Sequence, residues 1–321
     1  MTTNRNMTVT EEGDWSFQCR DIFTHHNRTY TYPLTNAFVQ FSYAIGIINC
    51  SAVPFTIVCN LILIVAIRMN KRLQTKTNFV ILSLLVSNLL VGLFSLPSHG
   101  AFVLLVAMRI SNCAIRAFTS IFSSTVAVTS ILLTILLSYE RYTALKKPFL
   151  YASKFTNKKI FFFAISSWLL AFAIILGAET RPTAMYASII MSLVMLIGYV
   201  YNIFVHLSLR KAVRRIRRNQ VTIKVANEDV NLAAEQEKAR KESRTNRFTA
   251  YVIGLQLIFN LPAIIVYSSL SYSGQGPVPF YIVDTIMCLH ATVSPALYLW
   301  QSPGLFKAVQ HLFNPSVSVQ E

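Results

Sequence analysis

The sequence predicts an all-α membrane protein, namely a seven-transmembrane helix bundle followed by a short amphipathic helix. The first observation is composition: the chain of 321 residues is 54% hydrophobic and only 13% charged, with a mean hydropathy of +0.48. Soluble domains carry about 25% charged residues. The second observation is that cutting the chain at every Asp, Glu, Lys and Arg leaves seven long uncharged runs. Each run approaches or exceeds the ~20 residues that a membrane-spanning helix requires.

The uncharged runs place the spans in chain order. We expect spans at residues 40–67, 78–104, 114–144, 160–178, 184–213, 245–270 and 279–301. A soluble helical bundle explains these runs less well, because its helices would each keep a polar face, whereas these runs are apolar on all sides. The rest of the chain then divides into a tail over 1–39, an amphipathic helix over 302–313 and a second tail over 314–321.

Basic residues gather in alternate connections between the predicted spans. One side holds the segments 68–76 and 141–159 and the basic connection 210–247, whereas the other side carries six arginines. Because positive charge is retained in the cytosol, we expect an extracellular N-terminus and a multi-pass protein of the plasma membrane. The net charge of +16 reflects this topology, so no nucleic-acid partner is expected.

Short motifs recur at one point in most of the spans. They are "CNLILIVAI" with Asn60, "LSLLVSNLL" with Asn88, "SYERY" with Glu140, Arg141 and Tyr142, the lone Trp168, "FNLPA" with Asn260 and Pro262, and "SPALY" with Ser294, Pro295 and Tyr298. In order and spacing this set resembles the class A (rhodopsin-like) G-protein-coupled receptors, over about residues 41–313. The short connection before the fifth span and the absence of proline from that span weakly resemble the melanocortin, cannabinoid, lysophospholipid and adenosine branch.

The resemblance implies a receptor that binds an extracellular ligand and activates a heterotrimeric G protein, without enzyme chemistry or a cofactor. It also implies a switch at the inner end of the third span. An arginine at the membrane boundary is costly unless it is paired, and Glu140 can hold Arg141. Alternatively, Arg141 is an interfacial side chain that reaches lipid phosphate.

Other residues of the predicted switch come from the same resemblance. Glu242 stands twenty residues before Pro262 and would form a second bridge to Arg141, holding the sixth helix against the third until activation moves it outward. Tyr298, which follows Pro295, would then stabilise the open state together with either Tyr199 or Tyr201.

A group of polar residues is expected near the middle of the membrane. It consists of Asn60, Asn88, Ser130, His290 and Ser294. In the family an acid usually stands at the position of Asn88 and binds sodium. Since no member of this group is a carboxylate, we expect a hydrogen-bonded network with water instead. Ordinary hydrogen bonds between helices are the simpler interpretation.

The expected ligand pocket lacks the features of two receptor classes. Ser123 or Ser124 stands where amine receptors carry an acid in the third span, so this helix offers a charged amine no anchor. The last span contains no lysine, which argues against a retinal photoreceptor. Asn260 replaces the usual tryptophan. Asp284 either faces the pocket, a ligand or a partner such as Arg116, or it only marks the outer membrane edge.

Covalent features are expected on the outer side. Asn6 and Asn27 begin Asn-x-Thr sequons and are predicted glycosylation sites. The usual disulfide of the family is missing. Cys19 and Cys113 are the extracellular candidates among five cysteines, and a disulfide and two free thiols are both compatible with the sequence.

The apolar face of the 302–313 helix is expected to contact membrane lipids at the inner leaflet. Two other functions stay open: a receptor-like protein that no longer signals and a seven-span transporter. No internal repeat supports the transporter. An intramembrane enzyme is disfavoured, because the sequence lacks paired acids and nucleophile motifs within the spans. No metal site is expected.

Overall fold

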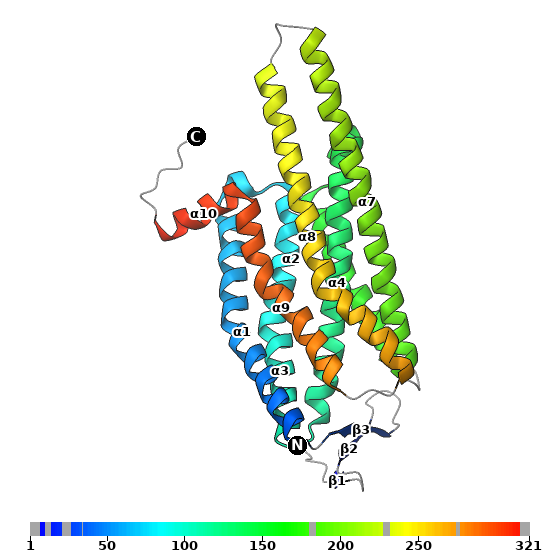
Figure 1. Ribbon diagram of the computed structural model, residues 1–321. Coiled ribbons are helices and arrows are strands. Elements are labelled where there is room, and N and C mark those ends of the chain that lie inside the picture. The colour runs from blue at the N-terminus through cyan, green and yellow to red at the C-terminus, as the bar shows by residue number, and fades with distance from the viewer. Residues whose placement is uncertain are drawn as a thin grey trace.

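The computed structural model confirms the predicted fold class. Within the residues that it describes, seven helices are long and apolar enough to cross a membrane, and they lie side by side as a bundle (Figure 1). The described residues are 7–9, 14–20, 27–33, 35–179, 184–226, 232–273 and 277–314.

Each predicted span lies inside an observed helical segment. The long helices are α1 (Asn36–Met69), α4 (Cys113–Lys146), α6 (Asn157–Glu179), α7 (Ala184–Ala226), α8 (Leu232–Ser273) and α9 (Val278–Gln301), with the second span formed by α2 (Lys76–Leu90), η2 (Val91–Ser95) and α3 (Leu96–Ala107). Three shorter helices are η1 (Lys71–Leu73), α5 (Pro148–Lys154) and α10 (Pro303–Phe313). The sequence analysis did not predict η1 or α5.

The second span is continuous but irregular, which the sequence analysis did not predict. It contains a turn of π-helix over Val91–Ser95, directly before Leu96 and Pro97. Proline cannot donate a backbone hydrogen bond, and its ring collides with the carbonyl four residues earlier in a regular helix. A π-turn relieves such a collision and rotates the following residues. After this turn, the side chain of His99 is only 2% exposed.

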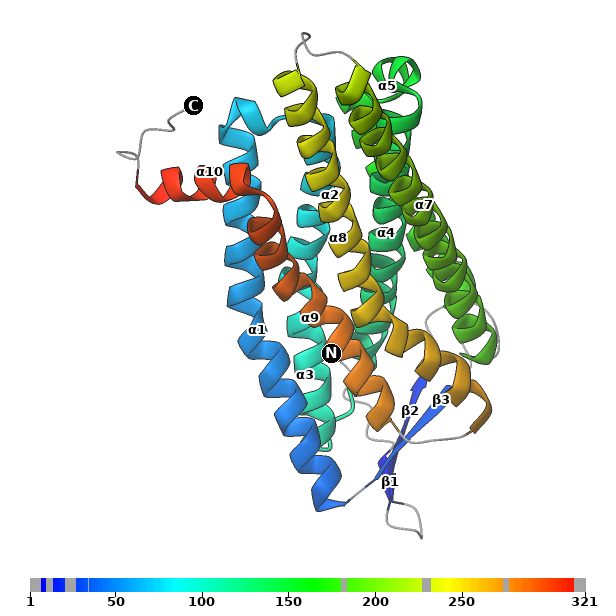
Figure 2. The same ribbon diagram turned by 45° about the horizontal axis from the view of Figure 1, so that its top comes forward.

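A small antiparallel sheet precedes the bundle, in the segment that the sequence analysis treated as a tail. Its strands are β1 (Met7–Val9), β2 (Trp15–Arg20) and β3 (Asn27–Tyr32), in the order β1-β2-β3. Trp15, Phe17 and Cys19 alternate along β2 and are buried. Since alternate side chains share one face of a strand, one face of β2 packs on the bundle. We call this end of the bundle the sheet end (Figures 1 and 2).

The opposite end carries the basic connections, and we call it the basic end. Here α7 and α8 extend past the other helices, well beyond the predicted spans (Figure 1). At the same end α10 lies across the bundle axis (Figure 2). Leu305 and Ala308 of α10 are buried in the cluster that includes α1 residues, whereas Phe306 and Phe313 are exposed. The apolar face of α10 is thus divided between the bundle and the surroundings.

Helices α1 and α3 approach each other closely at two glycines. A Cβ atom on Gly46 would lie 2.5 Å from Leu104 Cγ, and one on Gly100 would lie 3.2 Å from the Gly46 carbonyl oxygen and 2.7 Å from Cys50 Sγ. Small residues allow helices in membranes to approach closely and gain dispersion energy. Glycine is therefore required here because of its size.

We predict that Gly100→Ala destabilises the protein by about 1–3 kcal/mol, because a backbone oxygen must move to admit the methyl group. The measurement is thermal unfolding of the detergent-solubilised protein. Gly254→Ala is the matched control, since no atom lies within 4 Å of a Cβ built there. An equal effect of the two substitutions would contradict the packing role of Gly100.

Candidate functional site

At the basic end, a buried acid holds the adjacent arginine. The Glu140 side chain is 0% exposed and the Arg141 side chain 15% exposed. Arg141 donates hydrogen bonds from Nε and Nη2 to the Glu140 carboxylate and from Nη2 to Thr77 Oγ1. Thr77 Oγ1 lies 3.3 Å from Glu140 Oε1, to which it donates. The arginine is therefore directed toward α2 and away from solvent.

Tyr151 completes the shell around Glu140. Its hydroxyl donates to Glu140 Oε1 at 2.6 Å. Tyr151 lies on α5, which begins at Pro148, a residue favoured at the first position of a helix. Burial and the Glu140 carboxylate raise the pKa of the Tyr151 phenol, so it stays protonated and able to donate. A buried carboxylate is costly without partners, and here a guanidinium and two hydroxyl groups supply them.

The sequence analysis identified Glu140 and Arg141 but missed Thr77 and Tyr151. Neither residue carries a distinctive motif, and the turn between α4 and α5 that returns Tyr151 to Glu140 is a tertiary feature. Glu242 lies in α8, but its side chain is outside the described part of the structure. The predicted bridge between Glu242 and Arg141 therefore stays a prediction.

The other predicted switch residues take different positions. Tyr199 is 3% exposed and packs among residues of α4 and α8, whereas Tyr201 is 38% exposed. Tyr199 is thus the one of the two that faces the bundle. Tyr298 is buried, with its ring 5.6 Å from that of Phe248 on α8. Pro295 is buried within α9, and the ring of Tyr142 lies under the ammonium group of Lys146.

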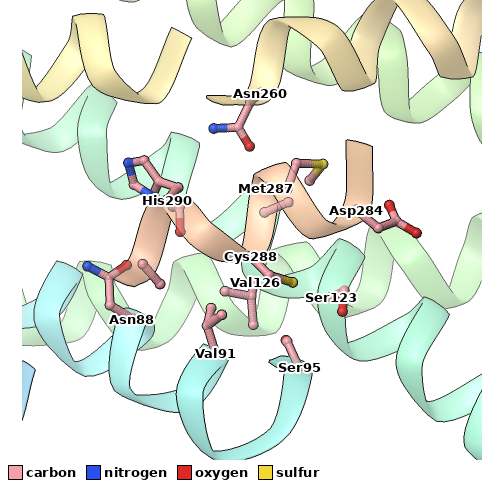
Figure 3. A pocket seen from close by; sticks show the side chains of 13 residues that line it. Asn88, Val91, Ser95, Ser123, Val126, Asn260, Asp284, Met287, Cys288 and His290 are labelled. Atoms are coloured by element: carbon pink, nitrogen blue, oxygen red, sulfur yellow. The ribbon is translucent and has the colours of Figure 1, made fainter. Parts of the chain in front are cut away.

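A small internal cavity of about 40 Å³ lies between the helices near the middle of the bundle (Figure 3). A buried water needs about 10–15 Å³, so this space suits a few waters. The lining residues that matter here are Asn88, Ser123, Ser130, Asn260, Asp284 and His290.

Two members of the predicted polar network bond directly to each other, and a third bonds to the backbone of α9. Asn88 Nδ2 donates to Ser294 Oγ at 2.7 Å, and Asn60 Nδ2 donates to the Ala291 carbonyl at 3.0 Å. Ser130 and His290 line the cavity beside Asn88, whereas Asn60 does not. Asp284 of α9 is the one acid on the cavity wall that the structure describes, and it lies apart from Asn88 of α2 (Figure 3).

Further hydrogen bonds between helices were missed by the sequence analysis. Between α1 and α9, the hydroxyl oxygens of Thr56 and Thr292 lie 2.6 Å apart, and Asn49 Nδ2 donates to Thr285 Oγ1 at 2.8 Å. From α4, Thr134 donates to Gln256 of α8, and Ser138 donates to Asn202 of α7 at 2.7 Å. Single Thr, Gln and Asn residues give no sequence signal of their partners, because the pairing depends on helix rotation.

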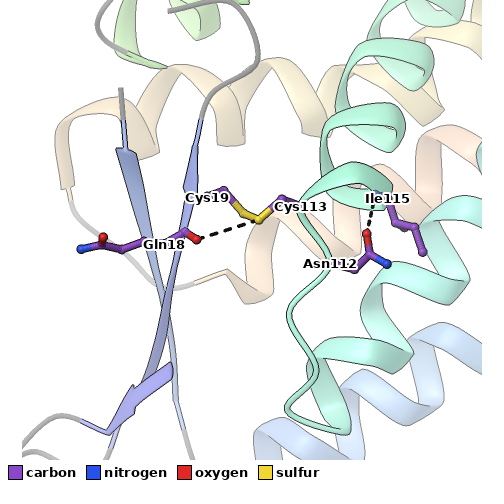
Figure 4. The surroundings of a disulfide bond; sticks show 5 residues. All are labelled: Gln18, Cys19, Asn112, Cys113 and Ile115. Carbon is purple, nitrogen blue, oxygen red and sulfur yellow. Dashed lines mark hydrogen bonds between the residues drawn. A yellow bond between two sulfur atoms is a disulfide. The ribbon is translucent and has the colours of Figure 1, made fainter. Parts of the chain in front are cut away.

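The sheet end is closed by a disulfide between Cys19 of β2 and Cys113 in the first turn of α4 (Figure 4). The Asn112 side chain accepts a hydrogen bond from the Ile115 amide at 3.0 Å and caps α4 there. Tyr32 of β3 packs against Phe38, and Phe38 packs against Tyr281. The sheet is therefore attached to the bundle both covalently and by aromatic packing.

The pocket candidates are only partly brought together. Ser123 and Asn260 line the cavity, whereas Ser124 and Arg116 do not. The guanidinium carbon of Arg116 lies 3.5 Å from the centre of the Tyr30 ring, a cation–π contact. Asp284 Oδ1 accepts a hydrogen bond from the Tyr267 hydroxyl. No ion pair joins Arg116 to Asp284, so the structure does not contain the pairing that the sequence suggested.

The predicted modification sites have little structural description. Asn6 lies outside the described residues, and Asn27 is the first residue of β3, with a side chain that is not described. In the described ranges, no group of three or more His, Cys, Asp or Glu side chains could hold a metal ion.

Comparisons with known proteins find similarity to one receptor family over part of the chain. A family model described as the 7 transmembrane receptor (rhodopsin family) matches residues 59–180. The muscarinic acetylcholine receptor M3 of Sus scrofa is 26% identical over 166 residues, which cover 51% of this chain and 28% of that receptor. Trace amine-associated receptor 365 of Petromyzon marinus is 35% identical over 124 residues, which cover 37% of this chain and 32% of that receptor. The chain thus spans less than a third of the length of these relatives.

We predict that the wild-type protein unfolds at the same temperature in sodium and potassium chloride, because Asn88 and Ser294 offer sodium no carboxylate and Asp284 lies apart from them on the cavity wall. Asn88→Asp supplies one beside Ser294, so it should introduce stabilisation specific to sodium. At a sodium concentration of ~10 Kd the gain is about 1.4 kcal/mol, or about 2–4 °C. Asn60→Asp, outside the cavity, is the control. Sodium-dependent unfolding of the wild type would contradict this prediction.

Proposed function

We propose that the chain is a class A, or rhodopsin-like, seven-transmembrane receptor, which binds an extracellular ligand and activates a heterotrimeric G protein. The partial match to the family model, the similar receptors and the seven apolar helices support this proposal. The observation that carries this proposal is the enclosed Glu140–Arg141 pair at the basic end. An arginine held inside the bundle by neighbouring side chains is available to a partner only after the helices move.

The proposed orientation places the sheet end outside the cell. The basic residues of the described chain concentrate at the other end, where the positive-inside rule expects the cytosol. The Cys19–Cys113 disulfide supports the same orientation, because disulfides persist in oxidising compartments. This orientation makes the plasma membrane the proposed location and keeps Asn6 and Asn27 as proposed glycosylation sites. The branch of the family also stays a prediction.

The proposed activation step is an outward movement of the basic end of α8. Pro262 interrupts the hydrogen bonding of α8, and a helix bends most readily at such a residue. Movement of α8 would open the space between α4 and α8 to the G protein. Arg141 would then exchange its bonds to Glu140 and Thr77 for bonds to the partner, while Tyr199 and Tyr298 would stabilise the open arrangement.

The hydrogen bond from Thr134 to Gln256 supports a specific resting contact between α4 and α8. Asn260, which replaces the usual tryptophan, donates instead to the Gln256 carbonyl at 2.7 Å within its own helix. We therefore place the coupling between the cavity and the basic end at Gln256. A receptor-like protein that does not signal is the alternative, because Asn88, Asn260 and Ser294 depart from the family pattern.

We predict that Arg141→Ala abolishes G-protein nucleotide exchange, because the substitution removes the proposed contact with the partner. The measurement is nucleotide exchange in membranes with matched surface expression. Arg72→Ala is the control, since Arg72 is an exposed basic residue at the same end of the bundle. Full exchange by Arg141→Ala would rule out the proposed coupling role.

We predict that Glu140→Gln raises ligand-free exchange about tenfold. Hydrogen bonds to charged groups contribute about 1.5–3 kcal/mol, and a change of ~1.4 kcal/mol shifts a small active population about tenfold. Thr77→Val and Tyr151→Phe, which each remove one donor to Glu140, should raise it by smaller factors. Glu242→Gln tests the second acid separately. Unchanged basal exchange in Glu140→Gln would show that this pair does not restrain the resting state.

A further inference from the structure

Asp284 is an acid within the sheet-end half of the bundle that the proposed coupling mechanism does not use. It lies in the second turn of α9 and is only partly exposed. The Tyr267 hydroxyl donates to one of its oxygens. Among the residues that the structure describes, no Lys, Arg or His nitrogen lies within 4.0 Å of its carboxylate. The acid therefore has one neutral donor and no counter-ion.

The nearest basic groups already have other contacts. Arg116 and His99 are the basic groups whose fields reach Asp284. The Arg116 guanidinium stacks on the Tyr30 ring at 3.5 Å, and its Nε is buried without a hydrogen-bond partner among the described residues. His99 Nε2 lies 3.4 Å from Thr285 Oγ1. The sheet thus keeps the arginine on Tyr30 and away from the acid.

A carboxylate that is partly shielded from water is costly, and a single phenol offsets only part of that cost. Asp284 also lines the internal cavity together with Ser123 (Figure 3). The Ser123 Oγ atom is buried and has no hydrogen-bond partner in the described structure. The wall therefore presents an acceptor without a counter-ion and a hydroxyl group without a partner.

We propose that this cavity binds the ammonium group of a small organic amine, with Asp284 as its counter-ion. The inference rests on the proposed function, because it names the chemical class of that receptor's ligand. Amine receptors carry the acid that binds the ammonium group in their third span, where this chain has Ser123 and Ser124. In this proposal the acid is instead on α9.

The size and chemistry of the cavity agree with an ammonium group. A volume of about 40 Å³ admits a group of this size with a water. The proposal requires the rest of the ligand to lie outside this volume. The Tyr267 and Phe280 rings pack 5.4 Å apart at that end and offer aromatic surface to a cation. An anion would be repelled by Asp284, and a neutral ligand would leave the carboxylate without a counter-ion.

The test is thermal unfolding of the full purified chain in detergent, with three ammonium ions and their neutral counterparts. The probes are isobutylammonium, cyclohexylammonium and 2-phenylethylammonium, each compared with isobutanol, cyclohexanol or 2-phenylethanol at equal concentration. We expect at least one ammonium ion to raise the unfolding temperature by about 3 °C or more, while its alcohol does not. If no ammonium ion does so, or if the alcohol does so equally, the proposal is overturned.

Variants locate the site. Asp284→Asn should abolish the shift, whereas Asp14→Asn, which removes one charge from the sheet end outside the cavity, should retain it. Arg116→Gln should lower the half-maximal ammonium concentration about threefold, because it removes a repelling cation. This second variant tests the site if Asp284→Asn does not fold. A shift that survives in Asp284→Asn, or an Arg116→Gln protein that binds more weakly, overturns the assignment.

The outcomes for coupling and binding are separable. Arg141→Ala should lose nucleotide exchange and keep the ammonium shift, because Arg141 lies at the other end of the bundle. A wild-type shift without any exchange would contradict the proposed function alone. Ligand-free exchange without any ammonium shift would contradict the amine site alone.

Discussion

The bundle depends on one constraint: no water is present in the hydrocarbon core to satisfy polar groups. The backbone meets this constraint by forming long helices, and the buried polar side chains meet it by bonding across helix contacts. Asn49 with Thr285 and Asn88 with Ser294 both join α9 to neighbouring helices in this way. Each such bond is worth only about 0.6 kcal/mol on average. Their number and direction therefore fix the rotation of each helix more than the stability of the whole.

The two ends of the molecule meet the same constraint with different chemistry. At the basic end, Glu140 is fully buried but is surrounded by donors, with its charge compensated by Arg141. At the sheet end, Tyr267 is the one hydrogen-bond donor to Asp284 among the described residues, while Arg116 is held on Tyr30. An acid whose charge is balanced by a neighbouring arginine suits a switch that is held in one state. An acid whose charge is not balanced suits a binding site in which the ligand supplies the cation. The proposed ligand site and the proposed coupling site are thus separated along the bundle.

The proposed link between the two sites includes Asn260, which departs from the family pattern. Asn260 lines the cavity and bonds to the Gln256 carbonyl, and the Gln256 side chain in turn accepts from Thr134 on α4. Because a hydrogen bond is directional, this contact breaks when α8 rotates or tilts. Under the proposed mechanism, it is the contact through which occupation of the cavity would change the packing of α8 against α4.

The sequence by itself determined the spans, because seven uncharged runs are long enough to cross a membrane. It also identified Glu140 beside Arg141, since neighbouring residues need no fold to meet. The structure decided what depends on contacts between distant segments: Thr77 and Tyr151 around Glu140, the Cys19–Cys113 disulfide, and the stacking of Arg116 on Tyr30. The sheet was missed because it depends on contacts with a distant segment, namely packing on the bundle and the Cys19–Cys113 disulfide. Hydrophobic length is a property of a segment, whereas a polar partner depends on helix rotation and depth, which only the packed bundle fixes.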